Sequence, residues 1–128
     1  MSRKELLAIG LFALATVGAI TAILAVESYR RKRVYTPELI ARAPEHGGWY
    51  PSTIRFPPGE PVRILIRNID TVTHGFAIPE LSIALSEIKA GEVKEIRFAV
   101  ERPGSYPFKC TVWCSTRHME MHGELVVE

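Results

Sequence analysis

The sequence predicts an all-β sandwich domain that follows a single N-terminal transmembrane α-helix. Three observations support this prediction. Residues 6–26 carry no charge and are rich in Ala, Leu, Ile and Gly. From Trp49 onward, short runs of β-forming residues alternate with Pro and Gly breakers. The chain has 128 residues in total, which leaves room for one small domain behind the helix.

The apolar run lies within an N-terminal region, residues 1–30, that we interpret as a membrane anchor. As a helix, residues 6–26 are long enough to cross a hydrocarbon core about 30 Å thick. A cleaved signal peptide is the alternative, but its apolar core would span only about 7–15 residues and end at a small-residue cleavage site. The observed run is longer, and the nearest candidate cleavage site, around Ala25, is poor. We therefore expect an uncleaved anchor.

The charges on either side of the anchor bear on its orientation. Arg3 and Lys4 precede the apolar run, and a run of four basic residues follows it at 30–33. By the positive-inside rule alone, the C-terminal domain would lie in the cytoplasm.

Residues 31–48 are interpreted as a linker. The T-P-E sequence at 36–38 is typical of a helix start, because Pro is favoured in the first turn. Leu39 and Ile40 could then form one short amphipathic turn. The Pro and Gly residues within 44–48 would end it.

Six short strands are predicted in the remaining region, residues 49–128. Each is bounded by turn-forming residues, and the second alternates Val62, Ile64 and Ile66 with Arg63, Leu65 and Arg67, which indicates one buried face. The predicted strands are residues 53–56, 62–68, 73–78, 93–100, 106–110 and 123–128. Strands at this spacing favour a β-sandwich.

The net charge of +2 is unevenly distributed along the chain. Seven Lys or Arg and three Glu precede residue 45, whereas nine Lys or Arg and eleven Asp or Glu lie from Glu45 onward. No basic patch with interleaved aromatic residues is present in the sequence, so nucleic acid is not an expected partner. The mildly acidic domain suits a basic protein partner, although an ordinary mixed surface explains the same charges.

Metal-binding side chains are concentrated in residues 110–121, which read C-T-V-W-C-S-T-R-H-M-E-M. Thiolate, thioether and imidazole groups all suit copper. Two thiolates can bridge two copper ions, which would then share one electron. Such a pair needs an end ligand on each ion. His118 can serve one, and the other must come from His46, His74 or His122.

A structural disulfide between the two cysteines is the alternative to a metal site. A bond that closes so short a loop would remove little entropy from the unfolded chain. The His and Met residues that follow the cysteines favour the metal.

The spacing C-x3-C-x3-H-x2-M, together with T-H-G-F at 73–76, resembles the binuclear CuA site of cytochrome c oxidase subunit II and of the C-terminal domain of nitrous-oxide reductase. The resemblance covers roughly residues 49–128 and includes P-P-G-E at 57–60 and R-P-G-S-Y at 102–106. H-M-E-M at 118–121 is closer to nitrous-oxide reductase, whereas the length and the anchor are closer to a short subunit II. The resemblance implies the Greek-key sandwich of cupredoxins.

The resemblance also implies a ligand set for two copper ions. It consists of two bridging thiolates, two imidazoles, one thioether and one backbone carbonyl. By position, the ligands are Cys110, Cys114, His74, His118, Met121 and the carbonyl of Val112. His118 and the carbonyl of Val112 would complete one copper ion, and His74 and Met121 would complete the other.

Several neighbouring positions depart from the family or have a less defined role. Many oxidases have a magnesium-binding glutamate where this chain has Val112, so no such magnesium site is expected, and Ser115 matches neither family version. Trp113 and Trp49 are candidates for accepting electrons, with plain packing as the alternative. His46 is expected to be exposed. His122 would point away from the site if it starts the last strand.

The function implied by the resemblance is that of subunit II of a haem-copper terminal oxidase. The CuA centre would accept electrons from a c-type cytochrome and pass them through His118 to haem in the catalytic subunit I, where the oxygen chemistry takes place. The copper domain would then lie on the periplasmic or extracellular side of the cell membrane, contrary to the positive-inside rule. Alternatives are a CuA subunit of a nitric-oxide reductase, a stand-alone membrane-anchored copper electron carrier linked to denitrification, and a copper-delivery protein.

Overall fold

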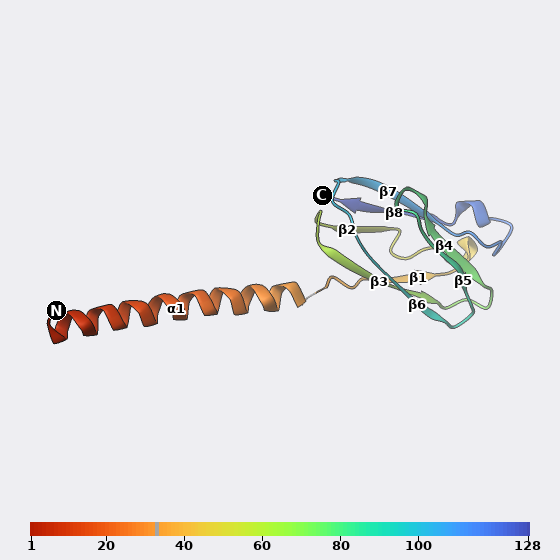
Figure 1. Cartoon of the computed structure of the whole chain (residues 1–128). Coiled ribbons are helices and arrows are strands. Elements are labelled where there is room, and N and C mark those ends of the chain that lie inside the picture. The colour runs from red at the N-terminus through yellow and green to blue at the C-terminus, as the bar shows by residue number, and fades with distance from the viewer. Residues whose placement is uncertain (33) are drawn as a thin grey trace. The chain divides into compact units, whose positions relative to one another are not determined.

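The protein consists of two compact units, a single helix and a β-domain that runs from Val34 to Glu128 (Figure 1). The structure is a computed structural model, and it describes residues 1–32 and 34–128.

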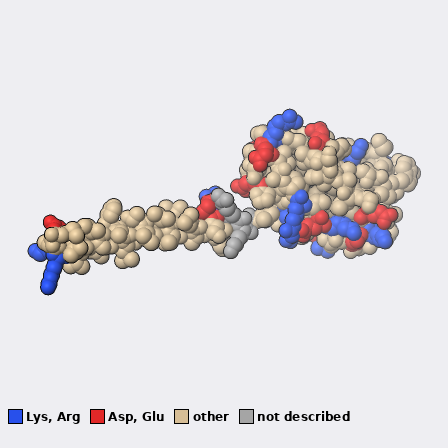
Figure 2. Space-filling model, viewed as in Figure 1, with Lys and Arg blue, Asp and Glu red and all other residues tan. Residues whose placement is uncertain are grey.

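Helix α1 (Arg3–Lys32) forms the first unit. Residues Arg3–Arg30 are apolar and long enough to cross a membrane, with a mean hydropathy of 2.4. In Figure 2 the charged residues of this helix lie near its ends and not along its middle. The hydroxyl of Thr16 donates to the carbonyl of Phe12, so this polar group is satisfied within the helix, as a lipid environment requires. The structure confirms an N-terminal apolar helix that could span a membrane.

The basic run at 30–33 is the sequence feature that bears on the orientation of α1 in a membrane. Arg33 lies outside the described residues, as do the side chains of residues 31–32.

The second unit is a sandwich of two sheets, which confirms the predicted fold class. The parallel pairs are β1 (Glu38–Ala41) with β3 (Pro61–Asn68) and β2 (Thr53–Phe56) with β8 (His122–Val127), and the other pairs are antiparallel. The smaller sheet has the order β1, β3, β6 (Val93–Ala99). The larger sheet has the order β2, β8, β7 (Gly104–Lys109), β4 (His74–Ile78), β5 (Ile83–Ile88).

The core lies between the two sheets and is built from alternating strand residues. Val62, Ile64 and Ile66 of β3 are buried while the residues between them are more exposed, as the sequence pattern predicts. Aromatic rings fill the end of the core near the 110–121 stretch. The rings of Phe76 and Phe108 lie 5.5 Å apart, on adjacent strands β4 and β7.

The interpretation of residues 31–48 as a linker with a helical turn is wrong for the part that follows Arg33. Val34 onward belongs to the compact β-domain, and the expected turn is strand β1, which pairs with β3. Leu39 and Ala41 are both fully buried. Their spacing of two residues is that of a strand with one inward face, and this burial outweighs the local helix-start signal.

Strand β5 is the other element that the sequence prediction lacks. It is an edge strand, and its register with β4 shifts between His74 and Phe76. Ile83 and Leu85 pack against the core in alternation, but the next buried residue is Ile88, three positions later. The irregularity breaks the period of two on which strand prediction depends.

Candidate metal centre

The metal-binding side chains of residues 110–121 lie on one loop between β7 and β8. Cys110 directly follows β7, and Met121 directly precedes β8. The backbone N–H of Cys110 donates to the carbonyl of Met121 at 3.0 Å, which closes the loop at its base. A short 3-10 turn, η3 (His118–Glu120), lies near the end of the loop and carries His118.

His74 reaches the same place from a different part of the chain. It is the first residue of β4, and its side chain is fully buried. Strand β4 runs antiparallel to β7 with Ala77 opposite Lys109. Residues that precede Ala77 therefore lie opposite residues that follow Lys109, and the metal loop begins there. The fold thus joins two sequence motifs that are 36 residues apart.

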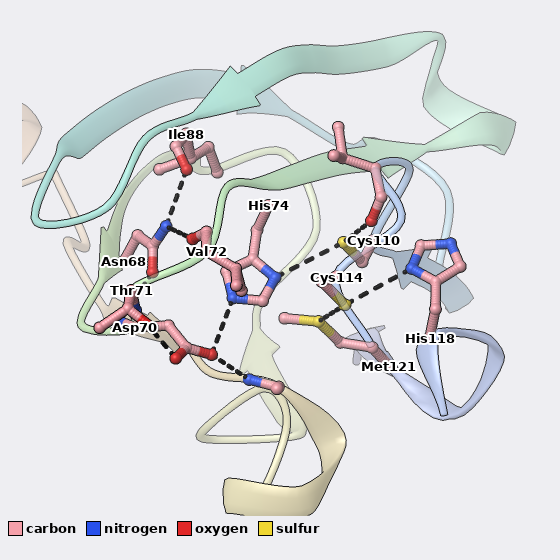
Figure 3. Close-up of polar contacts among 12 residues, drawn as sticks. Asn68, Asp70, Thr71, Val72, His74, Ile88, Cys110, Cys114, His118 and Met121 are labelled. Atoms are coloured by element: carbon pink, nitrogen blue, oxygen red, sulfur yellow. Dashed lines mark hydrogen bonds and ion pairs between the residues drawn. The ribbon is translucent and has the colours of Figure 1, made fainter. Parts of the chain in front are cut away.

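The structure brings the six predicted ligand groups together, and Figure 3 labels all of them except Val112. Cys110 Sγ lies 3.8 Å from His74 Nδ1 and 3.2 Å from the Val112 carbonyl oxygen. Cys114 Sγ lies 3.5 Å from His118 Nδ1 and 3.7 Å from the sulfur of Met121. One ligand atom each from His74, Cys110 and Cys114 lie within 4.8 Å of one another.

These distances fit groups that share a metal. Metal–thiolate and metal–imidazole bonds of about 2.3 Å and 2.0 Å, as for zinc, place the sulfur and nitrogen atoms about 3.5 Å apart at a tetrahedral angle. The two Cys–His distances are close to that value.

Both cysteines are free thiols, so the disulfide alternative is not what the structure shows. A donor set of two thiols, two imidazoles and a thioether is suited to copper.

Gly75 allows the metal loop to approach β4. A β-carbon on Gly75 would lie 2.2 Å from the Thr111 hydroxyl oxygen and 3.0 Å from Val112 Cγ2. The backbone N–H of Gly75 faces Cys110 Sγ at 3.5 Å, within the reach of a hydrogen bond to sulfur. The glycine therefore follows the histidine because the loop passes too close for a side chain.

A carboxylate behind His74 fixes the orientation of its ring. Asp70 Oδ2 lies 3.3 Å from His74 Nε2, and it also accepts the backbone N–H of Ala43 at 2.7 Å. A proton on Nε2 leaves the lone pair of Nδ1 facing Cys110, which is the arrangement that a metal-binding histidine requires.

The loop that carries Asp70 is held by a buried amide. The side chain of Asn68 donates to the carbonyls of Val72 and Ile88 at 2.7 and 2.8 Å and accepts the N–H of Asp70 at 2.8 Å. Sequence reasoning missed both Asn68 and Asp70. The N-I-D triplet at 68–70, which ends four residues before His74, was the available signal, but such a triplet is equally typical of an ordinary turn.

The electrostatic environment distinguishes the two cysteines. Burial raises the pKa of the Cys110 thiol, but the facing His74 ring and the backbone at Gly75 and Val112 hold it below its ordinary value overall. Burial, and then the charge of Cys110, raise the pKa of Cys114 to about 11. Burial also acts to raise the pKa of the Asp70 carboxyl, but the N–H groups of Ala43 and Thr71 and the His74 ring lower it overall. The first proton is therefore lost at Cys110, the thiol beside His74.

The two candidate tryptophans have opposite environments. Trp113 is 70% exposed, and its ring centroid lies 5.8 Å from that of His118. Trp49 is only 3% exposed and lies 6.5 Å from the His74 ring, with its indole N–H donating to the Met121 carbonyl. A protein partner can contact Trp113 at the surface, whereas Trp49 adjoins the site from inside.

The other histidines lie on the surface. His46 is exposed, as predicted, and His122 starts β8 with its side chain exposed. Met119 is 83% exposed, whereas Met121 is buried. Of the methionines near the loop, Met121 therefore has the environment of a ligand.

Comparisons with known proteins agree with this fold. The profile of the family described as "Cupredoxin-like domain" matches residues 15–127. Nitrous-oxide reductase from Cupriavidus necator is 27% identical over 103 residues, which cover 78% of this chain and 15% of that protein. The chain thus spans less than a fifth of the length of this relative.

Solved structures are similar over most of the chain. The periplasmic domain of subunit II of cytochrome oxidase from Bradyrhizobium japonicum superposes with a TM-score of 0.64 at 15% identity, over 76% of this chain and 86% of that one. A chain of a heme-copper terminal oxidase dimer solved by cryo-electron microscopy has a TM-score of 0.62 at 21% identity, over 98% of this chain and 100% of that chain. At these identities the similarity is one of fold.

Proposed function

The chain belongs to the family of cupredoxin-like domains, which are copper electron-transfer domains. From this membership we propose that the chain is subunit II, the electron-accepting subunit, of a haem-copper terminal oxidase. It would accept electrons from a c-type cytochrome at a binuclear CuA centre and pass them to haem in the catalytic subunit I. Catalysis at oxygen would take place in that partner and not in this chain.

One observation supports a binuclear site more than any other. Two unlinked thiols lie side by side, each with its own imidazole at 3.5 to 3.8 Å. A mononuclear blue-copper site uses one thiolate and two imidazoles, and Cys114 would be superfluous there. Two copper ions bridged by two thiolates share one electron, so that transfer changes each bond little.

The roles of the remaining ligands are assigned by the resemblance to CuA sites. Cys110 and Cys114 would bridge both ions, and the thioether of Met121 and the Val112 carbonyl would be weak ligands. His74 and Met121 would complete one ion, and His118 and the carbonyl of Val112 would complete the other. His74, Cys110, Cys114 and Met121 are all buried, so the chain excludes water from the site and keeps its ligands in one geometry. Such a fixed arrangement lowers the reorganisation that each electron transfer requires.

The surface around His118 is the proposed contact for redox partners. His118 is only partly buried and lies beside the exposed ring of Trp113. We assign Trp113 to contact with the electron donor and His118 to the exit toward haem. Trp49 can take part in electron acceptance only from inside the domain, because its ring is buried.

The proposed location is the cell membrane, with α1 as a single-pass anchor and the copper domain on the periplasmic or extracellular side. The length and apolar character of α1 support the anchor. The side is inferred from the similarity to the periplasmic domain of an oxidase subunit II.

Electron paramagnetic resonance of the copper-loaded full chain tests the binuclear centre. An electron shared equally over two copper nuclei gives a seven-line hyperfine pattern and a purple protein. A four-line pattern with a blue colour would show a mononuclear site and refute the proposal. Metal analysis should give two copper ions per chain.

A stand-alone membrane-anchored electron carrier linked to denitrification is the second candidate, as is a CuA subunit of a nitric-oxide reductase. The similarity to nitrous-oxide reductase supports a link to denitrification. Purification in mild detergent separates the candidates. A stable complex with a multi-helix haem protein supports a subunit role, and turnover with oxygen or nitric oxide then identifies the reaction. A chain that purifies alone and exchanges electrons with soluble partners supports the carrier.

A further inference from the structure

Residues 43–49, which we call the 43–49 segment, lie between β1 and β2 and contact the metal centre at both ends. Ile40 and Tyr50 flank the segment and exchange two backbone hydrogen bonds, of 2.7 and 3.0 Å. Inside this closed loop, the 3-10 turn η1 (Pro44–His46) is followed by two glycines with positive φ. The segment is thus a compact turn pinned at its base, and not a flexible connection.

The first contact acts on His74. The N–H of Ala43 donates to Asp70 Oδ2 at 2.7 Å, and the same oxygen faces Nε2 of His74 at 3.3 Å. The Asp70 side chain is only 11% exposed, so this interaction is poorly screened by water. The segment therefore holds the carboxylate that sets the orientation of one proposed copper ligand.

The second contact acts on the base of the metal loop. The indole N–H of Trp49 donates to the carbonyl of Met121 at 3.2 Å, and that carbonyl also accepts the N–H of Cys110 at 3.0 Å. One oxygen atom thus connects Trp49 to two proposed ligands. The Trp49 ring packs edge-on against Phe76 and Phe108, with centroid distances of 5.6 and 5.9 Å. This packing fixes the direction of the indole N–H.

A weaker contact lies between the two. The hydroxyl of Thr116 in the metal loop lies 3.4 Å from Glu45 Oε1, and both residues are exposed. A long hydrogen bond at the surface contributes little. The two buried ends of the segment are therefore the contacts that matter.

We propose that the 43–49 segment is a positioning element for the metal centre, with Ala43 acting through Asp70 on His74 and Trp49 acting through the Met121 carbonyl on Cys110 and Met121. This inference rests on the proposed function, since it assumes that these groups bind copper. None of the residues of the segment would touch the metal. Their role is to hold the ligands in one geometry, although one ligand comes from β4 and the others come from an irregular loop. Outer partners of this kind typically change metal affinity by about 10–100-fold when they are removed.

Two substitutions remove one hydrogen bond each and leave all proposed ligands in place. Ala43→Pro deletes the backbone N–H, and the φ of −57° at Ala43 already suits proline. Trp49→Phe keeps an aromatic ring but deletes the indole N–H. Matched controls are Ala43→Gly, which keeps the N–H, and Tyr50→Phe, which removes a polar atom from the neighbouring, 65% exposed ring.

The copper-loaded full-length chains, purified in detergent, are compared by copper release to a chelator and by electron paramagnetic resonance. We expect both Ala43→Pro and Trp49→Phe to release copper about tenfold faster or more and to show altered copper hyperfine splittings. The two controls should match the wild type. If both variants keep the wild-type release rate and spectrum, even with a lower melting temperature of the apo form, the segment is structural only and the proposal is overturned.

Two further readouts keep the outcome decisive. If Ala43→Pro fails to fold by circular dichroism, Asp70→Asn takes its place, because it keeps the shape but removes the charge that faces His74. Unchanged copper release and spectrum in Asp70→Asn would overturn the His74 half of the proposal. If the wild type shows a mononuclear spectrum, the proposed binuclear function fails, but the release rates still decide whether the segment positions the ligands.

Discussion

Gly75 and Thr111 lie so close together that a β-carbon on Gly75 would stand 2.2 Å from the Thr111 hydroxyl oxygen. The contact joins the strand that carries His74 to the loop that carries the cysteines. A side chain here would push the two apart, and the hydrogen bond from the Gly75 N–H to Cys110 Sγ would lengthen.

Gly75→Ala should therefore weaken both the fold and the metal centre. The forced contact is expected to lower the free energy of unfolding by about 1–3 kcal/mol and to speed copper release. Denaturant unfolding of the apo chain and chelator competition measure the two effects. Adding Thr111→Ala should recover part of the loss, because it removes the clashing oxygen. If Gly75→Ala matches the wild type in both measurements, the close approach is not maintained in solution.

Cys114→Ser should abolish the binuclear centre without unfolding the domain. Cys110 and His74 remain beside each other in this variant, so at most one copper ion should bind, without the coupled spectrum. Metal analysis and electron paramagnetic resonance provide the readout. Met119→Leu is the control, because Met119 is 83% exposed and its sulfur is not a proposed ligand. Retention of two coupled copper ions by Cys114→Ser would contradict the assignment of bridging thiolates.

Copper(I) loading should release protons at neutral pH. The pKa of Cys114 is raised to about 11, so this thiol is protonated at pH 7 and must lose its proton to bind metal. Copper affinity should consequently increase as the pH rises toward that pKa. A pH indicator in weakly buffered solution measures the release, which we expect to be at least one proton per chain. Cys114→Ser should release less, and an equal release would assign the proton elsewhere.

Asn68→Ala should destabilise the domain through unpaired polar groups. The side chain of Asn68 is fully buried and satisfies two carbonyls and one N–H. Each buried group left without a partner costs about 1–3 kcal/mol, so a loss of at least that size is expected in denaturant unfolding. Thr71→Ala, which changes an exposed side chain of the same loop, should stay within about 0.5 kcal/mol of the wild type.

Trp113→Ala should slow electron acceptance from a partner while leaving the copper spectrum intact. Truncation of an aromatic anchor residue at the centre of an interface typically costs more than 1 kcal/mol, or at least about fivefold in affinity. Stopped-flow reduction by a c-type cytochrome measures the effect. Val93→Ala, on strand β6 of the smaller sheet, is the control. Equal rates for Trp113→Ala and the wild type would place the contact surface elsewhere.

The ligand loop could be predicted from sequence because its information is local. Four side chains within twelve positions carry the chemistry, and a closed loop must bring them together whatever surrounds it. The strands with strict alternation, such as β3, could be predicted for the same reason. His74 needed the motif around it, since a single buried histidine has no signature of its own.

The elements that sequence reasoning missed depend on distant partners. Strand β1 pairs with β3, and Leu39 and Ala41 are fully buried there. A local pattern of four residues cannot reveal this burial, because it depends on a strand that lies more than 20 residues further along the chain. Asp70 can orient the His74 ring only because the fold brings both His74 Nε2 and the N–H of Ala43 to Asp70 Oδ2. The different environments of Trp49 and Trp113 likewise follow from packing and not from residue type.

The position of β1 also decides where a soluble fragment can begin. Pairing with β3 starts as early as Tyr35, whose carbonyl accepts the N–H of Arg63. A fragment that begins at Trp49 would strip one edge from β3 and leave the space of Leu39 empty, which favours aggregation. A fragment that begins at Val34 keeps this edge covered, so of these two fragments it is the one that should express as a monomer and accept copper.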